Sequence, residues 1–188
     1  MMAGALSVSP REVVDMVHRA SRAEGCSAGL ADRVAVDIAF CEVHHGAGIA
    51  AWLGLVDRSS AHLVEAVRSA YRLDLAVIEV RATGAGRQAW EPAIPFALVA
   101  RSLYELAGSG VRWAGEPDGA SGTDLLESVH LVAGECRPGG SDPFSERSKS
   151  VLAGGLSVDA TLWSRLEVIA ADFLMSEFRS KSLRLARF

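Results

Sequence analysis

Apolar residues recur every three or four positions through most of the first seventy residues, which is the spacing of helices that bury one side. The first of these helices has a clear start at Ser9. Glu12 follows three residues later, so the two side chains can form a capping box, and Pro10 occupies the first helical position. The pattern ends at Gly25, because glycine readily adopts the left-handed conformation that closes a helix.

The same pattern predicts three more helices in this part of the chain. Ser27 is the candidate N-cap of the second helix, which ends near Gly46. A short third helix covers residues 49–55, and a fourth follows as far as Tyr71. We therefore expect residues from about 9 to 71 to form a helical layer.

The period of the pattern changes at Leu73. From Leu73 to about Arg81, apolar residues occupy most positions on both sides of a two-residue repeat and β-branched residues are frequent, so we predict a strand that is buried on much of both faces. Residues 83–86 contain two glycines and predict a hairpin turn, and residues 87–90 predict the returning strand.

Short predicted elements alternate in the second half of the chain. A helix is expected over residues 95–107, and the last helix begins near Ser157 or Asp159. The further predicted strands cover residues 111–114, 124–132 and 146–152. Glycine-rich segments predict loops over residues 115–123 and 134–143.

Together these elements predict an α+β fold in a single domain, residues 1–188. The helical layer is followed by a sheet-containing part, over about residues 73–155, with a mainly antiparallel sheet of four or five strands. A long C-terminal helix covers about residues 157–188. The strong apolar stripe of this helix suggests that the protein is a homo-oligomer or binds a partner protein through it.

The composition is that of a globular protein, with 49% hydrophobic and 22% charged residues. A net charge of −4 argues against a nucleic-acid-binding protein, because phosphate recognition requires a basic surface. No run of about 18 apolar residues is present, so we predict no transmembrane helix and no membrane partner. Three cysteines without CxxC spacing, and no basic region in the first residues, indicate a cytoplasmic protein.

Residues that could carry chemistry are concentrated where the second predicted helix ends. Cys41 and His45 lie four positions apart on one helical face, a spacing that zinc can use if a third ligand comes from elsewhere. His44 or His45 could instead be a general acid or base, with Glu42 in support, because imidazole titrates near neutral pH. The structural alternative is that Cys41 is a core residue and the histidines cap the helix.

Tryptophan and arginine form a second candidate site. Trp90 and Trp113 fall on strands that we expect to be neighbours, with Arg81, Arg87 or Arg112 at the rim. Indole rings beside a guanidinium group suit a small carboxylate or an aromatic acid as ligand. The alternative is that the tryptophans are core residues and the arginines are solvated.

Cys136 is a third candidate. It stands beside Arg137 in a loop with glycine and proline, and an exposed cysteine near a positive charge can be a nucleophile. The sequence marks no partner base nearby, so a simple loop cysteine is the alternative.

Three groups of residues, spread over most of the chain, follow the motifs of one family. The first is a glycine-x-serine turn followed by a G-L-A run. The second is a proline-phenylalanine helix followed by a valine-arginine-tryptophan strand. The third is a helix of the form V-D-x-x-x-W-x-x-L-x-x-x-A, with serine, glutamate and arginine after it. The matching residues are Gly25, Ser27, Gly29, Leu30, Ala31, Pro95, Phe96, Ala100, Val111, Trp113, Val158, Asp159, Trp163, Leu166, Ala170, Ser176, Glu177 and Arg179. On these residues the chain resembles an uncharacterised bacterial family, domain of unknown function 3726.

The chain departs from this family at two places. Ala28 stands where the family has a tryptophan, and the glycine-rich, acid-ending tail that follows the last helix in the family has no counterpart before Phe188. The resemblance supports the order of elements and implies no activity, because the family has none assigned.

The pair His45-Gly46 is also similar to the histidine-glycine pair of the malate and lactate dehydrogenases that lack a Rossmann fold. In that family the histidine donates a proton beside a nicotinamide. The rest of this chain does not follow that family's pattern.

No catalytic constellation is complete in the sequence. We therefore expect a small cytoplasmic accessory or small-ligand-binding protein without enzymatic activity. The alternative is an enzyme that acts on a small metabolite with His44 or His45 as acid or base, with or without a metal ion.

Overall fold

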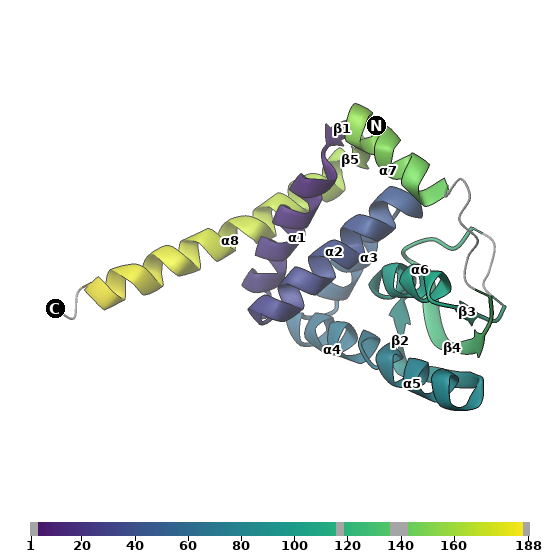
Figure 1. The fold of residues 1–188 in the computed structure, drawn as a ribbon. Coiled ribbons are helices and arrows are strands. Elements are labelled where there is room, and N and C mark those ends of the chain that lie inside the picture. The colour runs from purple at the N-terminus through teal and green to yellow at the C-terminus, as the bar shows by residue number, and fades with distance from the viewer. Residues whose placement is uncertain (1–3, 116–118, 136–142, 186–188) are drawn as a thin grey trace.

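The computed structural model of the chain describes residues 4–115, 119–135 and 143–185, and its side chains as far as Phe173 (Figure 1). In chain order its elements are β1 (Ala5–Val8), α1 (Pro10–Ala23), α2 (Ala28–His44), α3 (Gly48–Val56), α4 (Ser60–Ala70), α5 (Leu73–Thr83), β2 (Ala85–Pro95), the 3₁₀ helix η1 (Phe96–Leu98), α6 (Ala100–Gly108), β3 (Val111–Trp113), β4 (Leu125–Ala133), α7 (Pro143–Gly154), β5 (Leu156–Asp159) and α8 (Ala160–Leu185). The fold is α+β, as the sequence predicts, with most of these residues in helices.

The four predicted N-terminal helices are present. α1 begins with the capping box: the Ser9 Oγ accepts the backbone N–H of Glu12 (3.2 Å), and the Glu12 carboxylate accepts the backbone N–H of Ser9 (2.7 Å). α1 and α2 pack side by side, and α8 packs along α1 (Figure 1). The helices therefore form the layer on which the rest of the chain is arranged.

One continuous hydrophobic core connects the helical layer to the remaining elements. Trp52 of α3 is fully buried in it, and its Nε1 donates a hydrogen bond to the Ser21 Oγ of α1 at 3.0 Å. This bond satisfies the single polar atom of the indole ring, as burial requires.

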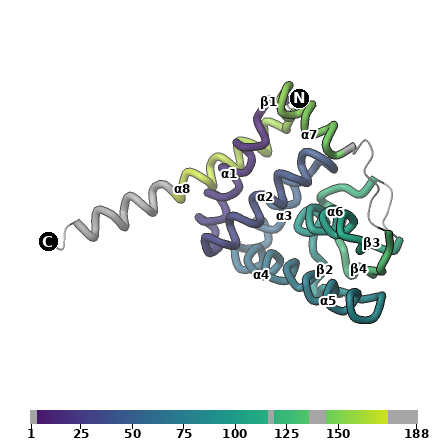
Figure 2. The backbone as a smooth tube through the Cα atoms, in the orientation of Figure 1, coloured from purple at the N-terminus to yellow at the C-terminus, as the bar shows by residue number. Residues whose placement is uncertain are grey.

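The strands of the described residues form two antiparallel sheets. β2, β3 and β4 lie together near α5 and α6 (Figure 2). The larger sheet has the order β2-β4-β3, and its strands lie where the sequence predicts the segments 87–90, 111–114 and 124–132. The smaller sheet pairs β1 with β5, and the sequence pattern did not predict either strand. Both strands have four residues, which is too short for a clear alternation.

Two predicted strands are wrong, because residues 73–81 belong to helix α5 and residues 146–152 belong to helix α7. The buried residues of α5 follow helical spacing: Leu73, Ala76, Val77 and Val80. Other apolar residues of α5 lie in solvent, with Leu75 64% exposed. A nearly continuous apolar run fits both periods, so the alternation was misleading there.

Two boundaries also differ from the predictions. The turn at residues 83–86 is present, but it joins a helix to β2, with Gly84 in the left-handed conformation (φ 86°) as the C-cap of α5. The segment 95–107 is divided into η1 and α6 instead of forming one helix.

The final helix begins where it was expected. The Asp159 carboxylate accepts the backbone N–H groups of Thr161 (2.8 Å) and Leu162 (3.1 Å), which makes it the N-cap of α8. The described part of the apolar stripe packs within the chain, because Leu166 and Ala170 are buried against the helical layer. This part of α8 is therefore core rather than a free surface for a partner. Among the described residues, no helix has both the length and the apolar character that crossing a membrane requires.

Candidate functional site

The side chains at the end of α2, from Phe40 to His45, face different neighbouring elements. Consecutive side chains on a helix point about 100° apart, so neighbours in the sequence face different elements. Cys41 and Glu42 face α3, whereas Phe40 and His44 face α7. We call the contact of Cys41 and Glu42 with the start of α3 the α2–α3 junction.

Glu42 has a structural partner in the junction. Its carboxylate accepts the backbone N–H of Ile49 at 2.8 Å, at the start of α3, where the N-cap residue Ala47 has no side-chain oxygen to offer. Burial raises the pKa of Glu42, and hydrogen bonds from Ile49 and Gly48 oppose this shift. Glu42 therefore replaces a missing N-cap side chain.

The junction is closely packed. A Cβ atom on Gly48 would lie 2.5 Å from the carbonyl oxygen of Ile38 and 2.9 Å from the backbone nitrogen of Glu42. Only glycine allows α3 to begin so near to α2.

Cys41 is fully buried in the same junction. Its Sγ lies 3.7 Å from the carbonyl oxygen of Gly46, and burial, with a smaller effect of Glu42, raises the pKa of the thiol to about 12. A thiol with this pKa is neither a nucleophile nor a ready metal ligand at neutral pH. The described residues contain no group of three histidine, cysteine or acidic side chains that could hold a metal ion, so Cys41 and His45 gain no third ligand there.

His45 is half-buried beside η1 and α7. Its ring meets Phe96 edge-on, with 4.8 Å between the ring centres. Burial lowers the pKa of His45, a hydrogen bond to the backbone of Ala120 opposes the shift, and the charge of Arg147 adds to it. The neutral ring is therefore favoured, and it is largely surrounded by protein.

His44 packs against two phenylalanine rings, which also stack on each other. Its ring centre is 4.4 Å from that of Phe40 on its own helix and 4.7 Å from that of Phe144 on α7. Its Nε2 is 3.3 Å from the Oγ of Ser148, also on α7. α7 is further attached through Arg147, whose Nε donates to the carbonyl oxygen of Val43 near the end of α2.

A mainly apolar groove opens beside this histidine and serine. It has a volume of about 290 Å³ and lies between α1, α2, α6 and α7. Its lining residues are Pro10, Val14, Val36, Ala39, Phe40, Val43, His44, Arg101, Ser148 and Leu152. Two of its apolar side chains are open to solvent, Val36 at 41% and Leu152 at 75% exposure.

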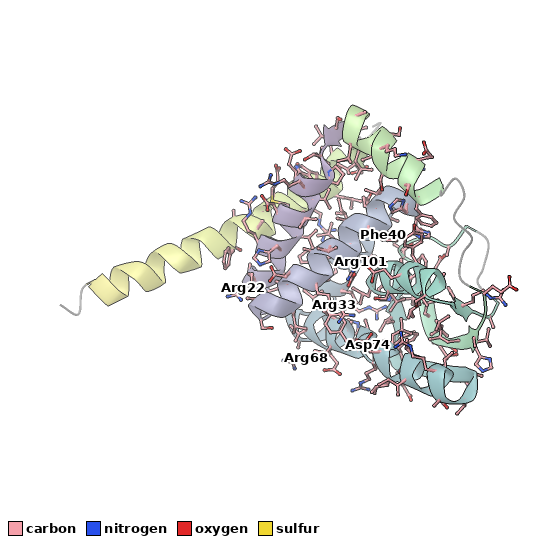
Figure 3. All side chains as sticks on the ribbon, in the orientation of Figure 1. Arg22, Arg33, Phe40, Arg68, Asp74 and Arg101 are labelled. Atoms are coloured by element: carbon pink, nitrogen blue, oxygen red, sulfur yellow. The ribbon has the colours of Figure 1, made fainter. Side chains whose placement is uncertain are left out.

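Arg101 is the one permanently charged side chain in this lining, and its charge is compensated. Its Nε donates to Asp37 and its Nη1 to Glu105, both at 2.6 Å. Asp37 is 1% exposed, and burial raises its pKa to about 6 although Arg101 favours the ionised form. Figure 3 shows Arg101 and Phe40 between α2 and α6.

The structure does not assemble the predicted site of Arg81, Trp90 and Trp113. Arg81 is exposed on helix α5 rather than at the end of a strand. Trp90 and Trp113 are not on neighbouring strands, because β4 lies between β2 and β3. The buried Trp90 donates from its Nε1 to the carbonyl oxygen of Ser69 (2.9 Å), and Trp113 lies near Phe96.

The second cysteine candidate, Cys136, lies outside the described residues. The groove residues Ser148 and Arg101, and Phe144 beside His44, were not found from the sequence. One sequence signal could have indicated the surroundings of His44. Phe40 stands four positions before it, and such residues lie side by side on a helix.

Comparison with known proteins assigns neither a family nor a function to the chain. No family model, curated protein or solved structure matches the chain. The resemblance to domain of unknown function 3726 therefore remains a prediction from sequence motifs. The site has to be interpreted from its own residues.

Proposed function

We propose that the protein binds a small, uncharged apolar or aromatic molecule in the groove between α1, α2 and α7. The observation that carries this proposal is the convergence of a groove of about 290 Å³ on one polar pair, the His44 Nε2 and the Ser148 Oγ. Ligand sites typically combine apolar walls with a few placed polar atoms, and small pockets have volumes from roughly 300 Å³. A molecule with one or two rings and one polar atom fits this description.

The charges of the groove favour an uncharged ligand. Arg101 is already bound by Asp37 and Glu105, so a ligand carboxylate would have to compete with two carboxylates of the protein. An aromatic ligand thus has more support here than the small carboxylate that the sequence suggests as the other possibility. Binding of such a ligand is the function we propose, in line with the sequence-based expectation of a small-ligand-binding protein.

Binding of the neutral fluorescent probe N-phenyl-1-naphthylamine tests this proposal. We expect a saturable fluorescence increase with one probe per chain. Val36→Trp fills the open side of the groove and should weaken binding at least tenfold, because the indole ring occupies the volume that the probe needs.

Ile78→Trp is the matched control. Ile78 is 65% exposed on α5, away from the groove lining, so this substitution adds the same ring to the surface and should leave binding unchanged. Absence of saturable binding, or equal loss in the two variants, would overturn the proposal.

A further inference from the structure

The groove brings together a hydroxyl group and an imidazole that α2 and α7 supply from positions 104 residues apart. The Ser148 Oγ lies 3.3 Å from the His44 Nε2, and both side chains line the groove. A serine within hydrogen-bond reach of a histidine is the arrangement in which the imidazole can remove the hydroxyl proton. Distances slightly beyond the normal range are common when no substrate is bound.

Two ring contacts hold the imidazole in place. Phe40 and Phe144 both contact its ring, with centre separations of 4.4 and 4.7 Å, so His44 cannot swing away from Ser148 without breaking two ring contacts. Both rings come from elements that also form the groove, which fixes the pair relative to a bound ligand.

From this geometry we propose that Ser148 is a nucleophile activated by His44, and that the groove accepts a small uncharged carboxylic ester whose apolar part lies along Val36, Phe40 and Leu152. The inference rests on the proposed function, since the ester must first bind in the groove.

The reaction follows from the two side chains and water. His44 Nε2 takes the Ser148 proton as Oγ attacks the ester carbonyl carbon, the bond from carbon to the alkoxy oxygen breaks, and His44 returns the proton to the leaving alcohol. Water then gives a proton to His44 and attacks the acyl-serine. The bond to Oγ breaks, Ser148 regains its proton from His44, and a carboxylic acid is released.

An alkyl fluorophosphonate provides the first test on the full chain. In this probe the P–F bond breaks as Oγ bonds to phosphorus, so an activated serine is labelled covalently whatever its natural substrate. Peptide mass spectrometry should place the label on Ser148. No label within hours, or equal labelling of the exposed Ser150 on the same helix, would refute the proposal on the unaltered protein, without a variant that has to fold.

Variants then test whether His44 is the general base that removes the proton of Ser148. His44→Gln keeps a similar size and should label roughly a hundredfold more slowly, which is the usual effect of losing a general base. Ser148→Ala should lose the label and the hydrolysis of p-nitrophenyl butyrate, whereas Ser150→Ala and His62→Ala should keep both. Labelling of Ser148 at an unchanged rate in His44→Gln would contradict the role of His44.

Probe binding separates this inference from the proposed function. Binding of N-phenyl-1-naphthylamine and labelling by the fluorophosphonate are therefore both measured on the wild-type chain. If the wild-type protein binds the probe but is never labelled, the catalytic inference fails and the binding function stands. If it neither binds nor is labelled, both fail.

Discussion

The two sides of the end of α2 have opposite character although they are built from adjacent residues. On one side, Cys41 and Glu42 are enclosed in the α2–α3 junction, and the two helices approach so closely that only Gly48 fits. On the other side, Phe40 and His44 face a groove that is partly open to solvent. A cluster of reactive residue types in a sequence therefore need not be one site, because a helix distributes it over different neighbours.

Substitution of Gly48 by alanine should have the largest effect, because it forces the junction apart. The new Cβ would lie 2.5 Å from a backbone carbonyl oxygen, which cannot rotate out of the way. We expect a loss of about 3 kcal/mol in the free energy of unfolding, measured by urea denaturation. Gly54→Ala on the same helix is the control: its Cβ would have nothing within 4 Å, and stability should rise by about 0.5–1 kcal/mol. Equal effects of the two substitutions would show that the junction is not tightly packed.

Removal of the Phe144 ring should have the next largest effect, on the groove side. Phe144 stacks on Phe40 at 5.8 Å and also contacts Tyr104 at 4.5 Å, so it holds α7 against the helical layer. Phe144→Ala should lower the free energy of unfolding by about 2 kcal/mol, less than for a fully buried ring, and should speed hydrogen exchange in α7. Lys149→Ala, at an exposed position of the same helix, should change stability by less than about 0.5 kcal/mol. Unchanged exchange in α7 would mean that Phe144 does not anchor it.

Glu42 should show the smallest effect and a defined dependence on pH. Glu42→Ala removes the acceptor for the Ile49 N–H and should cost about 1–2 kcal/mol, whereas Glu42→Gln keeps an acceptor and should be tolerated. Because the folded-state pKa of Glu42 is raised, the folded protein holds this proton more tightly than the unfolded chain. Its contribution to stability is therefore greatest at low pH and declines as pH rises from about 4 through the folded-state pKa.

Urea denaturation at acidic and neutral pH checks whether the contribution of Glu42 to stability declines as pH rises. Wild type should lose stability relative to Glu42→Gln as pH rises, since the glutamine stays neutral. A constant difference between the two proteins would contradict the raised pKa of Glu42, and equal losses in the glutamine and alanine variants would contradict the capping role.

Local signals in the sequence predicted the helical layer well. The capping box of Ser9 and Glu12 and the glycine near residue 46 are decided by a few neighbouring residues, and the structure has helix ends at these places. The segments 73–81 and 146–152 were assigned wrongly, because the choice between strand and helix there depends on what packs against them. Leu75 and Ile78 are apolar but exposed, so hydrophobicity alone could not give the buried face of α5.

The candidate site could be predicted only in part. His44 was identified, but its partner Ser148 lies 104 residues away in a segment predicted as a strand. Glu42 and Cys41 were also identified, yet their role depends on the approach of α3, which no local pattern encodes. Tertiary contacts between distant elements thus decided that His44 faces a groove, whereas Cys41 and Glu42 do not.

The pairing of β1 with β5 has a consequence for synthesis of the protein. Ala5 pairs with Asp159, and Val8 pairs with Leu156, so β1 is synthesised long before the strand with which it pairs. α1 and α2 are sequence neighbours and can pack during that time, since closing a short loop loses less entropy than closing a long one. The hydrogen bonds between β1 and β5, which join distant parts of the sequence, are thus expected to form after the contacts between α1 and α2.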